Sequence, residues 1–113
     1  MVKRTALIGV HEVKDMEDFQ NQLTAVGGNL VVIDFHATWC GPCKRMAPHL
    51  KEMTKTKENV VFLKVDVDDC EDTAAQYKIT TMPTFLFVKS NTKVADLPRA
   101  NVEELKELVN SHK

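Results

Sequence analysis

The sequence predicts an α/β protein built as a three-layer α/β/α sandwich, with helices on both faces of a central mixed sheet. Segments with strand character alternate with segments whose apolar residues recur at helical spacing. Two strand segments, 30–35 and 60–67, are nearly continuous apolar runs, as is typical of parallel strands buried on both faces. Because no repeat, low-complexity tract or linker separates these segments, we expect one domain over residues 1–113.

The first half of the chain begins with a run over 5–10 that suits a short strand. A helix follows it, because Asp15 is a helix-capping residue with a carboxylate three positions later. Its apolar residues recur at helical spacing until Gly27 and Gly28 end the helix. The strand over 30–35 comes next, and we expect it at the centre of the sheet.

A second helix follows this strand and lasts to about Lys57. Its inner face is marked by apolar residues at helical spacing, namely Cys43, Met46, Ala47, Leu50 and Met53. Pro48 lies within the helix and predicts a kink, because proline removes a backbone donor and clashes with the preceding turn.

The second half contains the strand over 60–67 and a short helix over 72–77. Two further strands, 85–88 and 93–97, flank the turn residues 90–92 and predict a β-hairpin. Alternating strands and helices form right-handed parallel crossovers, and the hairpin adds antiparallel strands at one edge of the sheet.

The chain ends in another helix. Pro98 closes the last strand, and Asn101 is followed three positions later by a glutamate, which together form a capping box. The predicted order is therefore strand, helix, strand, helix, strand, helix, hairpin and helix.

Composition disfavours several classes of function. The net charge of -1 gives no basic surface for nucleic acid, and no apolar run approaches the roughly 18 residues of a membrane span. The apolar stretch over 6–10 is short and is interrupted by His11 and Glu12, so we expect no secretory signal. Three cysteines are an odd number in a chain long enough to fold without disulfides. We therefore expect a cytoplasmic protein that binds neither nucleic acid nor membrane.

Two cysteines, Cys40 and Cys43, stand where the strand over 30–35 passes into the next helix. The free N–H groups at a helix N-terminus stabilise a thiolate, and the thiolate is the form that attacks disulfides. We therefore expect Cys40 to attack, and Cys43, one turn further in and more buried, to resolve the mixed disulfide. Gly41 allows close backbone approach, and Pro42 suits the first helical turn.

The alternative is half of a zinc site, because paired cysteines also bind zinc. A structural zinc ion needs about four ligands, and only Cys70 remains to supply another sulfur. The histidines form no matching pattern; they are His11, His36, His49 and His112. We therefore predict redox chemistry and no metal site.

The residues around the cysteine pair resemble a known family. The segment 35–44, FHATWCGPCK, is similar to the active-site signature of thioredoxins, and VDVD at 65–68 and MPTF at 82–85 resemble the same family in the same order. The resemblance spans the whole chain. It implies the thioredoxin fold and a protein-disulfide reductase that needs no bound cofactor. It also implies disulfide-containing client proteins, and recycling by an NADPH-dependent thioredoxin reductase.

Asp34 is a carboxylate within the apolar central strand. Burial raises the pKa of a carboxyl group, which makes Asp34 a proton acceptor near Cys43, and the resemblance assigns it to proton transfer. Lys64 interrupts the neighbouring strand where many thioredoxins carry a lysine near that aspartate. Pairing with Lys64 would lower the pKa of Asp34. The sequence leaves open which effect is larger and whether Lys64 instead faces outward.

Pro83 precedes a strand, where proline by itself indicates an edge or a turn. The resemblance implies more, namely a cis Met82–Pro83 bond packed against the cysteines. An extended substrate would then form backbone hydrogen bonds with Met82, in the way that a strand adds to the edge of a sheet. Trp39, otherwise an ordinary core aromatic, would join Met82 in an apolar contact surface around the thiols.

Three residues stand apart from the motif. Cys70 lies among four carboxylates that disfavour its thiolate, so we expect a bystander in a monomer. A regulatory disulfide or a disulfide-linked dimer through Cys70 is the alternative. His36 and Arg99 depart from the family pattern, which often has an aromatic or small residue at the first position and usually a glycine at the second. We expect His36 to be packed and neutral, and Arg99 to narrow or charge the substrate groove.

Three functions remain to be separated. The first is a cytosolic reductase of protein disulfides. The second is an oxidase or isomerase of the secretory pathway, which the Gly-Pro dipeptide between the cysteines and the lack of a signal disfavour. The third is a binding module with a restricted client set, in which the thiols matter little and Arg99 shapes the groove for one client.

Overall fold

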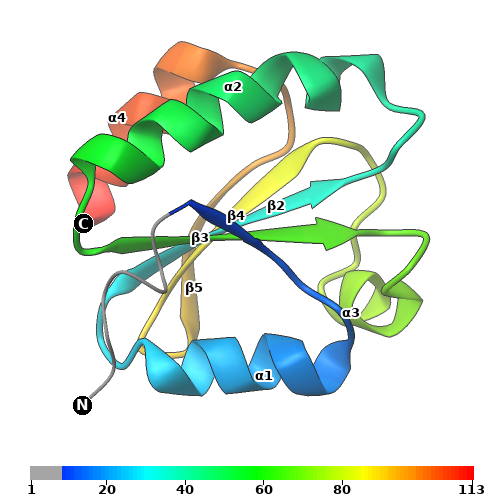
Figure 1. The fold of residues 1–113 in the computed structure, drawn as a ribbon, viewed down its shortest axis with the longest axis horizontal. Coiled ribbons are helices and arrows are strands. Elements are labelled where there is room, and N and C mark those ends of the chain that lie inside the picture. Colours follow the sequence, from blue (N-terminus) through cyan, green and yellow to red (C-terminus); the bar gives the residue numbers. More distant parts are fainter. Residues whose placement is uncertain (1–8) are drawn as a thin grey trace.

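The computed structural model describes residues 9–113 (Figure 1). Within them, the elements follow in the order β1 (Val10–Glu12), α1 (Met16–Ala25), β2 (Leu30–His36), α2 (Gly41–Thr56), β3 (Val60–Asp66), α3 (Glu71–Gln76), β4 (Thr84–Lys89), β5 (Thr92–Leu97) and α4 (Val102–His112). No helix in this part of the chain combines the length and the hydropathy that crossing a bilayer requires.

The strands form one mixed sheet in the order β1-β3-β2-β4-β5. β3 lies parallel to both β1 and β2, whereas β4 runs antiparallel to β2 and to β5. Helices α1 and α3 cover one face of the sheet, and α2 and α4 cover the other (Figure 1). The predicted sandwich, with a parallel centre and an antiparallel hairpin at one edge, is therefore confirmed.

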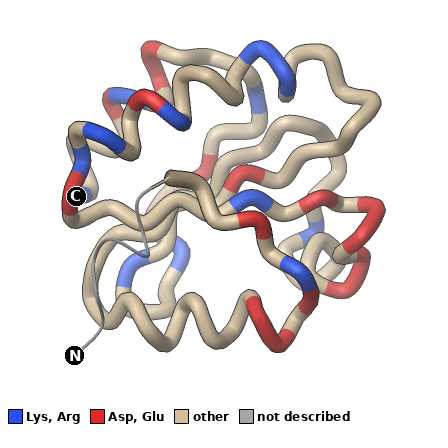
Figure 2. The backbone as a smooth tube through the Cα atoms, viewed as in Figure 1, with Lys and Arg blue, Asp and Glu red and all other residues tan. Residues whose placement is uncertain are grey.

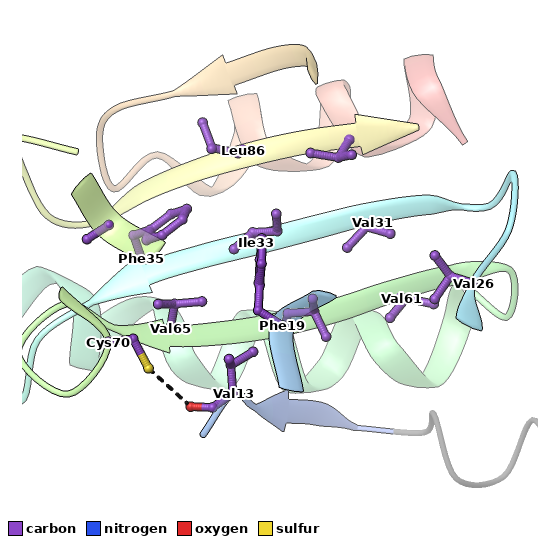
Figure 3. Packing of buried hydrophobic residues seen from close by; sticks show 13 residues of the cluster. Val13, Phe19, Val26, Val31, Ile33, Phe35, Val61, Val65, Cys70 and Leu86 are labelled. Carbon is purple, nitrogen blue, oxygen red and sulfur yellow. Dashed lines mark hydrogen bonds between the residues drawn. The ribbon is translucent and has the colours of Figure 1, made fainter. Parts of the chain in front are cut away.

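β2 lies at the middle of the sheet, and every residue in it is buried. Side chains alternate between the two faces of a strand, so Ile33 and Phe35 enter the core beneath α1 and α3, whereas Val32 enters the core beneath α2 and α4. Figure 3 shows Phe19 of α1 among the side chains of the first core. Burial on both faces explains why the sequence of β2 is apolar without alternation.

Local signals predicted from the sequence mark both ends of α1 and the hairpin turn. The Asp15 side chain accepts a hydrogen bond from the Asp18 N–H at 2.8 Å and caps α1. Gly27 has a φ of 60° and follows the last turn of α1, since glycine adopts this left-handed conformation without steric cost. Ser90 and Asn91 both have positive φ, which gives the β4–β5 hairpin a two-residue turn that matches the twist of its strands.

The structure differs from the sequence prediction at the start of the chain. Of the strand predicted over 5–10, residues 5–8 lie outside the described part, and β1 occupies Val10–Glu12 instead. Pairing with β3 explains this position, because it places Val10 opposite Phe62, and both pack in the core beneath α2 and α4. α3 begins one residue earlier than predicted. α2 passes through Pro48 as one helix, and the kink expected there stays a prediction.

Candidate active site

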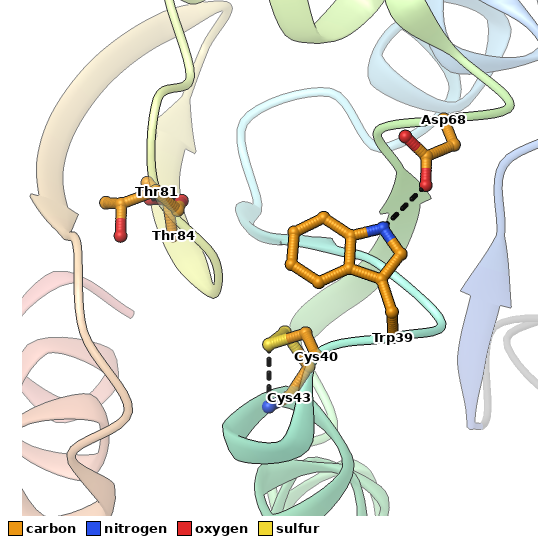
Figure 4. Close-up of a disulfide and its surroundings, with 6 residues drawn as sticks. All are labelled: Trp39, Cys40, Cys43, Asp68, Thr81 and Thr84. Carbon is orange, nitrogen blue, oxygen red and sulfur yellow. Dashed lines mark hydrogen bonds between the residues drawn. A yellow bond between two sulfur atoms is a disulfide. The ribbon is translucent and has the colours of Figure 1, made fainter.

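Cys40 and Cys43 lie at the junction of β2 and α2 and form a disulfide, with their Cα atoms 5.3 Å apart (Figure 4). Cys40 is the N-cap residue of α2, which begins at Gly41. Pro42 occupies the first turn of the helix, where its missing N–H leaves no helical hydrogen bond unmade. The structure therefore places the motif at the predicted strand-to-helix junction.

The Cys40 sulfur lies at the N-terminus of α2. The backbone N–H of Cys43 donates to Sγ of Cys40 at 3.1 Å. This N–H and the positive end of the helix dipole both stabilise a thiolate once the disulfide is reduced. Sequence reasoning expected Cys43 to be the more buried, but both cysteines are 5 % exposed. The reason is that Ala37, Val67 and Met82 pack against the pair as a whole.

Asp34 lies on β2 in the same row of side chains as Val32, beneath α2, and it is 2 % exposed. Burial raises the pKa of its carboxyl group to about 7, against a lowering by Lys64 and with a smaller rise from Glu12. Among residues 9–113, Oδ1 of Asp34 finds no hydrogen-bond partner. A carboxyl group with a pKa near neutrality can both take up and release a proton at physiological pH.

Lys64 is the direct neighbour of Asp34 in the pairing of β3 with β2, so the two side chains share one face of the sheet. Both questions that the sequence left open are thereby answered. Lys64 faces the side on which Asp34 lies, and burial of Asp34 outweighs the attraction of the lysine. An open hollow of about 470 Å³ lies beside Cys43, and Lys64 and His36 also line it.

The peptide bond between Met82 and Pro83 is cis, as the resemblance implies. The Met82 side chain packs against the cysteine pair. The hydroxyl of Thr84 donates to the Thr81 carbonyl at 2.6 Å, which bridges the segment that carries the cis bond (Figure 4). The structure therefore brings Met82 to the disulfide from a segment about 40 positions away in the sequence.

Trp39 is 65 % exposed, so it lies on the surface beside the disulfide rather than in the core. Its Nε1–H donates to Oδ2 of Asp68 at 2.9 Å, from the connection between β3 and α3 (Figure 4). Sequence reasoning missed Asp68 as a partner of Trp39. The run of carboxylates after β3 was visible, but nothing local in the sequence links that run to the cysteines.

We expect Asp68→Ala to increase the mobility of the indole ring, because it removes the hydrogen bond at the edge of that ring. Trp39 is the single tryptophan of the chain, so the anisotropy decay of its fluorescence measures this mobility directly. The free energy of unfolding should fall by less than about 1 kcal/mol, since the bond is exposed. Asp69→Ala, at the adjacent exposed carboxylate, is the control. An unchanged decay in Asp68→Ala would show that packing holds the ring instead.

Cys70 is buried at the start of α3, in the acidic connection that Figure 2 shows after β3. Burial and the charges of Asp69 and Asp66 raise the pKa of its thiol. The thiol donates a weak hydrogen bond to the Val13 carbonyl, at 3.6 Å. These features favour the bystander role expected for Cys70, because the raised pKa disfavours the thiolate that an attacking cysteine needs.

Arg99 is paired with α4. Its Nε donates to Oε1 of Glu104 at 2.8 Å, and its Nη2 donates to Oε2 at 3.0 Å. The pairing raises the pKa of Arg99 and lowers that of Glu104. The N–H of Glu104 also donates to the side chain of Asn101, which caps α4 as predicted. Arg99, which we expected to charge the substrate groove, is therefore paired with the carboxylate of Glu104.

His36 is buried, as expected, and its Nε2 lies 3.3 Å from Oε2 of Glu12. Sequence reasoning missed this contact, because 24 positions separate the two residues and only the sheet brings them together. No three side chains of histidine, cysteine, aspartate or glutamate among residues 9–113 are grouped so that they could hold a metal ion.

Comparison with known proteins gives a consistent result. The sequence profile of the thioredoxin family matches residues 10–111. The thioredoxin of Callithrix jacchus is 46 % identical over 101 residues, which are 89 % of this chain and 96 % of that protein. The thioredoxin of Mus musculus is 50 % identical over 93 residues, which are 82 % of this chain and 89 % of that protein.

Solved structures agree with the sequence comparison. The thioredoxin of Fasciola hepatica superposes with a TM-score of 0.89 at 39 % identity, covering 91 % of this chain and 99 % of that one. Thioredoxin F from spinach chloroplast superposes with a TM-score of 0.91 at 31 % identity, covering 99 % of this chain and 98 % of that one.

Proposed function

The chain belongs to the thioredoxin family, and on this basis we propose that its oxidised Cys40–Cys43 pair is reduced again by an NADPH-dependent thioredoxin reductase. The protein is a thiol-disulfide oxidoreductase that reduces disulfides in client proteins. One observation carries the proposal: the two cysteines are within bonding distance at the N-terminus of α2, where a thiolate on Cys40 is stabilised.

The reaction moves two electrons from the cysteine pair to the client. The Cys40 thiolate attacks one sulfur of the client disulfide, whose S–S bond breaks, and the sulfur that leaves takes up a proton. Cys40 is then joined to the client in a mixed disulfide. Cys43 attacks Sγ of Cys40, the mixed disulfide breaks, and the second client sulfur leaves and is protonated. The product is the disulfide seen in this structure.

We assign to Asp34 the proton that Cys43 must lose before it attacks. Three features support this role: Asp34 lies beneath α2, burial raises its pKa to about 7, and its Oδ1 makes no hydrogen bond within residues 9–113. Cys43 and Lys64, the neighbour of Asp34 on β3, line one open hollow. A base with a pKa near the working pH is the most effective one for such a transfer.

We assign client binding to Trp39, Met82 and Pro83. Trp39 exposes most of its indole beside Cys40, and Met82 is half-buried against the cysteine pair. Aromatic and methionine side chains supply apolar contact area that suits varied partners. An extended client segment would pair with the backbone of Met82 and present its disulfide to Cys40. Gly41 and Pro42 separate the two cysteines and complete the site.

We further propose that the protein acts as a monomer in the cytoplasm. The odd number of cysteines supports a reducing compartment. Burial and neighbouring carboxylates raise the pKa of the Cys70 thiol, which donates to the Val13 carbonyl, and both features disfavour a dimer linked through Cys70. Size-exclusion chromatography under oxidising conditions distinguishes the monomer from the dimer.

Reduction of insulin by NADPH and thioredoxin reductase tests the function. We expect the wild-type protein to accelerate NADPH consumption, and Cys40→Ser to return it to the uncatalysed rate, because the attacking sulfur is lost. Cys70→Ser is the matched control and should keep the wild-type rate. Replacing the reductase with dithiothreitol separates the two parts of the proposal. A wild-type protein as inert as Cys40→Ser with both reductants contradicts disulfide reduction, whereas inertness with the reductase alone contradicts recycling.

A further inference from the structure

Ionisable side chains gather on the sheet face beneath α2, next to the disulfide. They come from the ends of three neighbouring strands and are Glu12 on β1, Lys64 and Asp66 on β3, and Asp34 and His36 on β2. Directly paired residues of parallel strands share one face of the sheet. Glu12 pairs with Lys64, and Lys64 pairs with Asp34, so these three form one row across the sheet.

Lys64 therefore lies between two carboxylates. Asp34 is buried on one side, whereas the Glu12 side chain on the other side is 58 % exposed. Lys64 lowers the pKa of Asp34, and Glu12 raises it. Two strand spacings of about 4.8 Å place the two carboxylates about 10 Å apart. At that distance, one charge changes the pKa of a partly buried group by roughly half a unit to one unit.

His36 contacts the second carboxylate, Glu12. Its ring reaches across β3, and its Nε2 lies 3.3 Å from Oε2 of Glu12. Asp66 is the direct neighbour of His36 on β3, but Oδ1 of Asp66 already accepts from the N–H groups of Asp68 and Asp69. Histidine is the side chain whose charge changes near neutral pH. A proton on His36 would cancel the charge of Glu12.

We propose that Glu12 and His36 are positioning residues that set the proton affinity of Asp34 through Lys64. The inference rests on the proposed role of Asp34 as the acceptor of the Cys43 proton. When Glu12 is ionised and unpaired, its negative charge offsets the attraction of Lys64 for the Asp34 carboxylate. Asp34 then keeps its proton to a higher pH. When His36 is protonated, it pairs with Glu12 and neutralises its charge. Lys64 then stabilises the Asp34 carboxylate more strongly, and Asp34 releases its proton more readily.

The consequence is that the pKa of Asp34 itself depends on pH. As the pH falls through the range in which histidine takes up a proton, the pKa of Asp34 falls with it. Asp34 therefore remains available as a carboxylate to lower pH than it would without the contact between His36 and Glu12. The rate at which Cys43 resolves the mixed disulfide should depend less steeply on pH in the wild-type protein than in a His36 variant.

The other groups that face this cluster come from α2 and β4. From α2, Cys43 and Lys44 line the hollow beside Lys64, and Lys51 lies on its other side. From β4, Phe85 is the neighbour of Asp34 and does not ionise. In the oxidised protein Cys43 carries no proton. A titration of the disulfide form therefore reports on Asp34 without an overlapping thiol.

The test is a carbon-13 NMR titration of the Asp34 carboxyl group in the oxidised protein, assigned by the loss of its signal in Asp34→Asn. We expect Glu12→Gln to lower the titration midpoint by roughly half a pH unit. His36→Gln should move it in the opposite direction, because Glu12 then stays unpaired. In the Glu12→Gln background, the same His36 substitution should have a smaller effect. His11→Gln is the matched control, since His11 pairs with Asp18 instead, at 2.9 Å, and the midpoint should not move.

Two outcomes overturn the proposal: an unchanged midpoint in Glu12→Gln, or a shift of the same sign in both single variants. Glu12→Gln replaces a half-exposed side chain by one of equal size, so it keeps the proposal testable if His36→Gln does not fold. Insulin reduction by the wild-type protein is measured separately. Failure of that assay with intact midpoint shifts contradicts the proposed function, whereas normal activity without the shifts contradicts only this inference.

Discussion

Cys43→Ser is expected to convert the reductase into a trap that stays covalently bound to its clients. Cys40 can still attack, because the backbone N–H that donates to its sulfur at 3.1 Å is kept in the serine variant. The mixed disulfide is no longer resolved, because the remaining thiol, that of Cys70, is buried in the core beneath α1 and α3. Intramolecular attack by an oriented group corresponds to effective concentrations of about 10⁵ M or more. Turnover should therefore fall at least about a thousandfold.

The measurement combines insulin turnover with capture of clients on immobilised Cys43→Ser protein. Elution with dithiothreitol should release many proteins, and mass spectrometry under non-reducing conditions should show each as a mixed disulfide with Cys40. The double variant Cys40→Ser/Cys43→Ser should capture none, and Cys43→Ser/Cys70→Ser should capture as many as Cys43→Ser. One client held without a covalent bond would instead support the binding module with a restricted client set.

Much of this fold is predictable because its signals are local. Asp15 and Asn101 cap their helices through side-chain bonds to an N–H three positions later, and such bonds depend on adjacent residues alone. β2 and β3 read as buried strands because both of their faces are covered. β1 extends to Glu12, beyond the predicted end at residue 10, because a strand of three residues takes its position from its register with β3 rather than from its own sequence.

The candidate site is predictable to a smaller extent. The spacing of Cys40 and Cys43 and their place before a helix are local, and they predict the chemistry. The partners of the surrounding side chains are not local. Asp68 bonds to Trp39 across 29 positions, and the register of three strands decides which charges meet Lys64. A sequence pattern carries no information on whether burial or a neighbouring lysine dominates at Asp34, because both depend on the packed structure.

Asp34→Asn is expected to stabilise the oxidised protein strongly at pH 8 and little at pH 4. The folded-state pKa of Asp34 is raised from 3.8 to about 7, so the unfolded chain binds fewer protons than the folded chain between these values. The free energy of unfolding therefore falls as pH rises through this window. A shift of about three units corresponds to about 4 kcal/mol at pH 8, which is a large part of the stability of a small domain. Asparagine has nearly the same shape and no charge, so it removes this loss.

Urea unfolding of the oxidised protein at pH 4 and pH 8 measures the effect. Asp96→Asn is the matched control, because Asp96 is half-exposed and pairs with Lys93 at the surface, and its substitution should change stability by less than about 0.5 kcal/mol at either pH. An equal gain for Asp34→Asn at both pH values would mean that packing, not the buried charge, limits stability. If the gain grows with pH as expected and insulin reduction slows, the destabilising carboxylate is kept because the resolving step needs a base beneath α2. The raised pKa that weakens the fold would then be the same property that lets Asp34 accept the proton of Cys43 near neutral pH.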